Sequence, residues 1–181
     1  RFARFKEDLE VIDRLLKSDT AVDFAGTYYQ LRDAVLLPRP SRPGGPPILI
    51  GGNGPRRTLP LVVRYAAEWN GVYASPETYA GLNRRLDGLL TEAGRAPGSV
   101  RRSLMAGCMF GRNAAEVEAR AAAHGTTVEK LRASGKVAVG DGAEIRDQLA
   151  AWAAAGVQRI MLQWLDLDDL SGLDALAAAV L

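Results

Sequence analysis

The chain has 181 residues and a mass of 19.4 kDa, with 48% hydrophobic and 24% charged residues. These values are typical of one soluble globular domain and exclude a disordered or fibrous segment. The 23 basic and 21 acidic residues leave a net charge of +2 without a basic stripe, so we expect no nucleic-acid partner. We also expect no membrane partner, because no apolar run approaches the ~18 residues of a membrane-spanning helix. The single cysteine, Cys108, excludes an internal disulfide and favours the cytoplasm.

The first 47 residues predict a helix followed by extended structure. Between residues 2 and 16, apolar side chains recur every three or four positions among charged ones, which predicts an amphipathic helix. Residues 20–37 change period around Gly26 and predict a short hairpin or extended arm. A proline-rich link follows. Since the chain begins without methionine inside this helical pattern, we expect it to be part of a longer protein.

From residue 48 onward, short apolar runs alternate with helical patterns. Strands that are apolar along their whole length and separated by helices indicate a parallel sheet covered on both faces, so the class is α/β. We expect residues 124–140, which contain three glycines, to be irregular. The predicted strands are 48–50, 69–73, 102–110 and 157–164; the predicted helices are 55–66 and 75–94, one from 113, one over 141–156 and one from 168.

Two architectures fit this alternation: an open doubly wound sheet and part of a (β/α)8 barrel. A barrel of ~250 residues uses about 31 per unit, so four strands make half of one. The leading helix favours the truncated barrel, because it needs a preceding strand–helix partner to bury its apolar face. We therefore expect one domain over residues 1–181 that forms half of a (β/α)8 TIM barrel.

The best candidate for a binding site is the glycine-rich turn after the first apolar strand. Glycines there let a ligand approach the backbone, and the next helix offers free N–H groups and a positive dipole end. Arginines in the first turn of that helix are unfavourable by ~0.3–1 kcal/mol unless an anion binds. The alternative is a plain connection with both arginines in water. The predicted binding residues are Gly51, Gly52, Asn53, Gly54, Arg56 and Arg57.

Four residues at strand ends are further candidates, because the C-terminal ends of barrel strands line the active face. Gln163 and Trp164 end the last predicted strand, and Trp69 and Asn70 begin the second. The alternative is that the tryptophans are ordinary core aromatics. The lone histidine, His124, indicates a helix cap or a surface residue. The buried Cys108 is expected to be inert, and we expect no metal site.

Four segments in this order resemble the bacterial luciferase-like monooxygenase superfamily. They are residues 26–31 (GTYYQL), 46–59 (PPILIGGNGPRRTL), 64–70 (RYAAEWN) and 159–170 (RIMLQWLDLDDL). The last two resemble the branch that uses the deazaflavin coenzyme F420. The likeness runs from residue 1 to residue 181, with one departure: the family usually has Asp where this chain has Ala67.

The resemblance implies a (β/α)8 barrel that binds F420, or FMN in sister groups, at the C-terminal ends of its strands. The chain would be the C-terminal half, and turn 51–54 would lie against the phosphate or ribityl part of the cofactor. Residues 124–140 resemble a mobile insertion that could act as a lid. The residues that handle protons usually come from the first half of such barrels, so we name no catalytic residue.

The expected function is an F420-dependent oxidoreductase that transfers a hydride at C5 of the deazaflavin to or from a small organic substrate. By analogy with relatives, we expect a homodimer when the protein is intact. The first alternative is an FMN-dependent monooxygenase. The second is a non-catalytic half-barrel that binds phosphate-bearing ligands and dimerises to cover its open strand edges and its uncovered apolar face.

Overall fold

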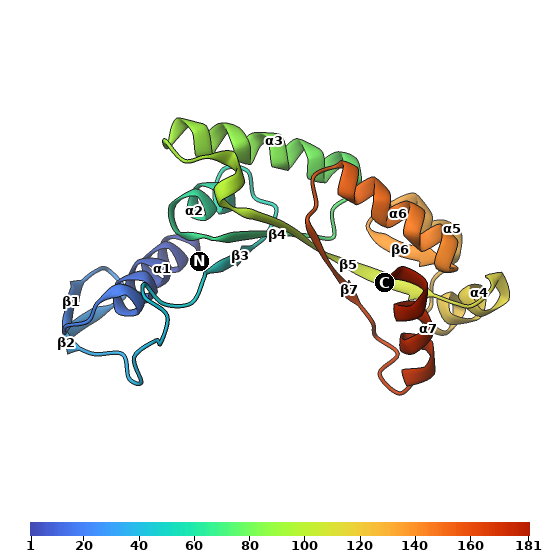
Figure 1. The fold of residues 1–181 in the computed structure, drawn as a ribbon, viewed down its shortest axis with the longest axis horizontal. Helices are drawn as coiled ribbons and strands as arrows, with labels where there is room; N and C mark the ends of the chain where they lie inside the picture. Colours follow the sequence, from blue (N-terminus) through green and yellow to red (C-terminus); the bar gives the residue numbers. More distant parts are fainter.

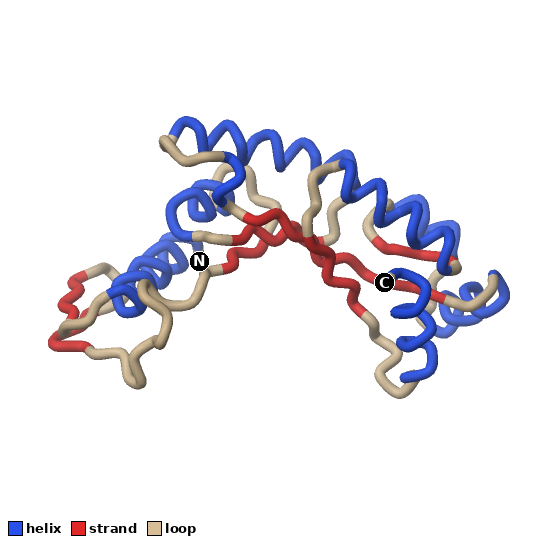
Figure 2. Tube along the Cα trace, viewed as in Figure 1, coloured by secondary structure: helices blue, strands red, loops and turns tan.

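The computed structural model describes residues 1–181 and contains a parallel sheet bent into an open arch (Figure 1). Two long helices, α3 (Pro76–Glu92) and α6 (Gly142–Ala154), lie along the convex side of this sheet. The concave side faces away from them and carries no helix over its centre (Figure 2). None of the helices combines the length and the apolar character needed to cross a membrane.

The N-terminal end of the arch is formed by α1 (Phe2–Lys17) and an antiparallel hairpin of β1 (Val22–Ala25) and β2 (Gln30–Ala34). The Glu7 carboxylate of α1 accepts the backbone N–H groups of residues 27, 28 and 29 at 3.0, 2.7 and 2.8 Å. A Cβ at Gly26 would collide with this carboxylate, which explains the glycine there. The predicted helix and hairpin are thus confirmed, and one side chain joins them.

The main sheet has five parallel strands. Its longest strand, β5, pairs with β4 over residues 101–105 and with β7 over 103–107, so these two neighbours occupy its opposite edges. The small β6 pairs with the C-terminal end of β5 only. The strands are β3 (Leu49–Gly51), β4 (Glu68–Val72), β5 (Arg101–Phe110), β6 (Val137–Gly140) and β7 (Arg159–Gln163).

The helices between these strands begin and end where local side chains satisfy the backbone. Ser75 accepts from the N–H of Thr78 at the start of α3, and Asp141 forms a capping box with Glu144 at the start of α6. Gly156, in the left-handed region with φ +98°, follows the end of α6. The remaining helices are α2 (Thr58–Tyr65), α4 (Ala114–Ala123), α5 (Val128–Ser134) and α7 (Leu170–Val180), with a short 3-10 turn, η1, at Pro97–Ser99.

The hydrophobic core lies between the convex side of the sheet and the helices. Trp69 of β4 is fully buried and stacks on Tyr79 of α3, with ring centroids 4.8 Å apart. Leu104 of β5 is also fully buried in this layer. Successive residues of a strand point to opposite faces. The residues next to Trp69 in β4 and next to Leu104 in β5 therefore face the concave side. The arch therefore has one packed face and one open face.

Three predicted boundaries need correction. Residues 124–140 are not irregular, because they contain α5 and β6, and Ala138 and Val139 of β6 are fully buried in the sheet. The second half of this segment is thus core and not lid. Helix α2 begins at Thr58 rather than at residue 55, since residues 55–57 form a turn. Strand β7 is shorter than the predicted 157–164, and the sheet has one strand more than predicted.

Candidate functional site

The glycine-rich turn leads from the C-terminal end of β3 into α2. Gly52 lies at φ +124°, and its N–H donates to the carbonyl of Asn70 at 2.9 Å. The carbonyl of Gly54 accepts the N–H groups of Thr58 and Leu59. A Cβ at Gly54 would lie only 2.8 Å from Thr58 Oγ1. Glycine is therefore required at two points of the turn by its own geometry.

The Asn53 side chain ties the turn to the neighbouring strand. Its Nδ2 donates to the carbonyl of Val72 at 2.6 Å, and its Oδ1 accepts the Val72 N–H at 2.9 Å. Both polar groups of this amide are thus used within the protein. Only the backbone N–H of Asn53 is therefore available for the predicted binding role. Its side chain fixes the shape of the turn.

The backbone N–H groups ahead of α2 are free. Those of Asn53, Gly54, Arg56 and Arg57 have no acceptor in the protein. They lie at the N-terminal end of a helix, where the dipole favours negative charge. Gly51, which precedes them in the chain, has open space at its Cβ position. A Cβ there would meet one atom within 4 Å, the Asn70 carbonyl oxygen at 3.9 Å. The turn thus offers donors and space to an anionic group.

The two predicted arginines are placed differently. Arg56 is exposed, and its side chain forms no hydrogen bond or ion pair in the protein. Arg57 is the N-cap residue of α2, and its guanidinium lies over the ring of Phe2 at 5.2 Å from the centroid. In this conformation Arg57 contributes its backbone N–H to the turn, while its charge is directed to α1. Both arginines precede the helix and are not in its first turn as predicted.

The prediction that Trp69 faces the active side is wrong. Its ring is buried among the helices, and its Nε1 donates to the Gly52 carbonyl at 2.9 Å, so it supports the turn from behind. Asn70 faces the other way, and its Nδ2 donates to Ser103 Oγ at 3.0 Å and lies 3.9 Å from Met161 Sδ. Asn70 therefore belongs to the concave face.

The two candidates at the end of β7, Gln163 and Trp164, also point to different faces of the sheet. Gln163 accepts a hydrogen bond from the Tyr73 hydroxyl on the concave side. Trp164 packs against the core, its Nε1 donates to the Asp166 carbonyl at 2.8 Å, and Arg120 of α4 stacks on its ring. Trp164 thus joins β7 to α4 and does not face the concave side as expected.

Tyr73, which the sequence did not single out, follows the last residue of β4. Its φ is +47°, an unusual conformation for a bulky residue. The Tyr73 N–H donates to the Met105 carbonyl at 2.9 Å, and the hydroxyl reaches Gln163. Strained backbone of this kind costs roughly 1–3 kcal/mol and concentrates at functional positions. The pair of Tyr73 and Gln163 therefore joins the candidate site.

An ion-pair cluster lies beside this edge, between α4 and the loop that follows β7. Arg120 pairs with Asp166 and with Asp169, and His124 Nε2 lies 2.8 Å from Asp166 Oδ1. The hydrogen bond from Arg120 lowers the pKa of Asp169 to about 2, and the contact with His124 lowers the pKa of Asp166. Asp169 also caps α7 through the Gly172 N–H. His124 is thus a surface residue that secures a loop.

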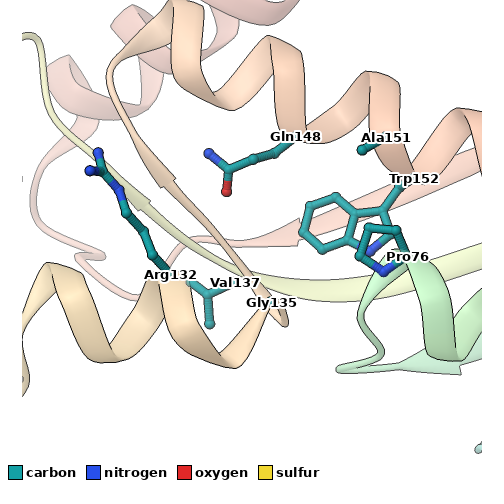
Figure 3. Close-up of a pocket in the computed structure, with 7 residues that line it drawn as sticks. All are labelled: Pro76, Arg132, Gly135, Val137, Gln148, Ala151 and Trp152. Atoms are coloured by element: carbon teal, nitrogen blue, oxygen red, sulfur yellow. The ribbon is translucent and has the colours of Figure 1, made fainter.

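Two other features, a hollow beside α6 and the thiol of Cys108, offer no free polar group to a ligand. A hollow of about 360 Å³ lies between α6, β6 and the start of α3 (Figure 3). Gln148 bonds to the backbone of Val139, Arg132 pairs with Glu144, and Trp152 Nε1 donates to Ala74. The thiol of Cys108 is buried as predicted, and burial raises its pKa to about 12, which disfavours the reactive thiolate.

The parallel sheet and its alternating helices define a partial (β/α)8 barrel. The luciferase-like monooxygenase family matches residues 1–138. The chain belongs to this family. The resemblance and the fold class predicted from the sequence are thereby confirmed.

The relatives include both F420-dependent enzymes and monooxygenases. The F420-dependent glucose-6-phosphate dehydrogenase of Amycolatopsis mediterranei (strain U-32) is 41% identical over 66 residues, which are 36% of this chain and 17% of that protein. The solved F420-dependent secondary alcohol dehydrogenase with an F420-acetone adduct has a TM-score of 0.73 at 18% identity, over 89% of this chain and 55% of that one. EDTA monooxygenase from Chelativorans sp. BNC1 has a TM-score of 0.78 at 14% identity, over 99% and 59%. The chain thus spans little more than half of these solved relatives.

Proposed function

We propose that this chain is the C-terminal half of an F420-dependent oxidoreductase that exchanges a hydride between the deazaflavin and a small organic substrate. The observation that carries the proposal is the turn between β3 and α2, where backbone N–H groups without acceptors stand beside the open position of Gly51. The sequence relative with 41% identity is F420-dependent, which favours the deazaflavin over FMN.

The residues of the turn fit a phosphate-bearing cofactor. The free N–H groups of Asn53, Gly54, Arg56 and Arg57 would hold phosphate oxygens, and the positive end of the α2 dipole adds to the attraction. The unpaired side chain of Arg56 supplies a full positive charge close to them. Asn53 and Trp69 hold the turn in shape, so little ordering would be needed on binding.

When bound, F420 supplies the hydride-carrying carbon of its ring; the chain contributes binding and orientation. On the concave face, Tyr73 and Gln163 present a hydroxyl and an amide group to whatever lies against the strands, whereas Asn70 is buried and bonded to Ser103. These groups would orient the substrate and separate it from water. We assign no proton-transfer role to any residue of this chain.

FMN-dependent monooxygenation is the second candidate function. The structural similarity to EDTA monooxygenase favours this alternative, since its TM-score of 0.78 is higher than the 0.73 of the F420-dependent secondary alcohol dehydrogenase. The phosphate-binding turn would serve either cofactor. Only the identity of the retained cofactor separates the two functions.

The test is competitive retention. The chain, alone and joined to the first half of a barrel of the same family, is mixed with equal F420 and FMN, and the spectrum of the protein-bound fraction is recorded after ultrafiltration. We expect F420 to be retained. Retention of FMN alone would favour the monooxygenase function over the F420-dependent one. Retention of neither cofactor would refute a cofactor role for the turn.

A matched variant connects this result to the turn. Gly51→Val places a side chain in the open space beside the free N–H groups, where a Cβ meets no atom of the protein closer than 3.9 Å. We expect this variant to fold as the parent does and to lose cofactor retention. Unchanged retention in Gly51→Val would show that the cofactor binds elsewhere.

A further inference from the structure

A separate pocket of about 470 Å³ lies at the opposite edge of the sheet, where the strands begin. Ile48 and Ala67, which directly precede β3 and β4, are among its lining residues. The rest of the wall comes from the last turn of α1, the proline-rich link, the end of α2 and η1. We call it the basal pocket.

The basal pocket carries an excess of positive charge. Lys17, Arg42, Arg64 and Arg95 line it, and Asp13 is the only acidic residue in its wall. Four cations and one carboxylate line the pocket, and Glu10, just outside the lining, pairs with Arg64, so the cations exceed the nearby carboxylates by two. Converging like charges destabilise a protein unless a counter-charge is present, and clefts with charge of one sign concentrate oppositely charged ligands.

The protein itself pairs two of these cations with acids. Lys17 pairs with Asp13 at 2.6 Å, and Arg64 forms a longer pair with Glu10 at 3.8 Å. Arg42 has no side-chain partner in the protein. Arg95 donates to the carbonyls of residues 63 and 66 and so caps α2, but it pairs with no acid. Most of the donors on these guanidinium groups are therefore free.

A buried hydroxyl in the same wall also lacks a partner. Tyr65 lines the basal pocket, and its Oη is buried without any hydrogen bond in the protein. Burial raises the pKa of this phenol, so the hydroxyl keeps its proton and can donate. An unsatisfied buried polar group is costly, so binding of a ligand oxygen that reaches this hydroxyl would be favoured.

The rim of the pocket is preformed. Gly45 adopts φ +80°, and a Cβ there would lie 2.9 Å from the Cβ of Leu16, so the link is packed tightly on α1. Arg39 holds the same link by donating to the Leu15 carbonyl at 2.9 Å and to Asp19 at 3.0 Å. A preformed rim lowers the ordering cost of binding.

We propose that the basal pocket binds a small multivalent anion of the phosphate class, held by Arg42, Arg64 and the Tyr65 hydroxyl. The pocket is at the edge opposite to turn 51–57, so this site is independent of the proposed cofactor. Such an anion accepts hydrogen bonds from guanidinium and hydroxyl donors and offsets the excess positive charge. The source of the phosphate group is either free inorganic phosphate or a phosphorylated metabolite.

The test is a titration of the ¹⁵N-labelled chain with inorganic phosphate, followed by amide NMR at constant ionic strength with chloride as the matching salt. We expect saturable shifts at Gly44, Gly45 and Ser99. The amides of turn 51–57 report any phosphate at the proposed cofactor site separately, so one site can fail without the other. Absence of saturation at the three basal amides, or equal shifts with chloride, would overturn the proposal.

Two variants and a control identify the ligand groups. Tyr65→Phe and Arg42→Ala should each weaken phosphate binding by about tenfold, as expected for one lost hydrogen bond to a charged group. Arg84→Ala, which removes an exposed and unpaired arginine of α3, should not change it. Because the Tyr65 hydroxyl has no partner, Tyr65→Phe should fold at least as stably as the parent. Unchanged affinity in both variants would refute the assignment.

Glycerol 3-phosphate in place of inorganic phosphate distinguishes the two sources. Tighter binding of the ester assigns the site to a phosphorylated metabolite, and tighter binding of the inorganic ion assigns it to free phosphate. Either result supports a phosphate-class ligand.

Discussion

The two faces of the sheet are built from alternate residues of the same strands, yet they differ in how they are covered. On the convex face, Trp69 and Leu104 are fully buried under helices. On the concave face, Leu49 and Met161 remain 46% and 37% exposed, and Gly51 leaves open space. The convex face holds the packed core, and the concave face carries no helix over its centre (Figure 2). Substitutions on the two faces should therefore differ in how much they lower stability.

The largest contrast is expected between Trp69 and Leu49. Trp69→Ala removes a buried stacked ring and the support of Gly52, and should lower the free energy of unfolding by about 3–5 kcal/mol. Leu49→Ala, on the open face, should cost under about 1 kcal/mol. Urea unfolding followed by circular dichroism measures both. Similar losses for the two variants would contradict the division between the faces.

Adjacent arginines of β5 give the next contrast. Arg102 is buried and donates to Asn83, to the Val100 carbonyl and to Asp87, at 2.6, 2.6 and 2.5 Å. Because Asp87 is partly exposed, we expect Arg102→Ala to cost about 2 kcal/mol, below the about 3–5 kcal/mol of a fully buried pair. Arg101→Ala, at an exposed position, should change stability by less than about 0.5 kcal/mol. Equal unfolding midpoints would disprove the assignment of Arg102 to the core.

Two glycines of the same turn sharpen the comparison at the ligand edge. Gly54→Ala brings a Cβ to 2.8 Å from Thr58 Oγ1 and should destabilise the chain by about 1 kcal/mol. Gly51→Ala meets nothing nearer than 3.9 Å and should leave the unfolding midpoint unchanged while it weakens cofactor retention. Thermal unfolding and ultrafiltration are read on the same samples. A loss of stability in Gly51→Ala alone would show that the open space is a packing requirement.

The sequence predicted the parts of this design that depend on local chemistry. The predicted helices 75–94 and 141–156 begin at Ser75 and Asp141, residue types that favour helix starts because their side chains accept nearby N–H groups. The turn at 51–54 was identified because glycines directly follow an apolar strand. Helix α5 and strand β6 were missed because each is too short to produce a recognisable period beside its glycines.

The facing of side chains was harder to predict than the elements themselves. The assignment of Trp69 and Trp164 to the active side was wrong. A shift of one residue in a strand exchanges the two faces, and the sequence alone does not fix which residues point to which face. Tyr73 was missed, since its left-handed backbone depends on contacts with β5 and β7. The cluster of Arg120, Asp166 and Asp169 joins residues more than forty positions apart, a contact that no local pattern indicates.

The smallest expected effect concerns this cluster, which secures the loop after β7 beside the concave face. Arg120 lowers the pKa of Asp169 from 3.8 to about 2, so the ion pair stabilises the fold above pH about 4 and loses this contribution as the pH falls toward 2. The fluorescence of Trp164, on whose ring Arg120 stacks, should change over this interval. In Asp169→Asn the amide oxygen still caps α7 but the ion pair is lost, so this change should already be present at neutral pH. An identical acid titration in the two proteins would show that the loop is held by the packing of Trp164 and not by the ion pair.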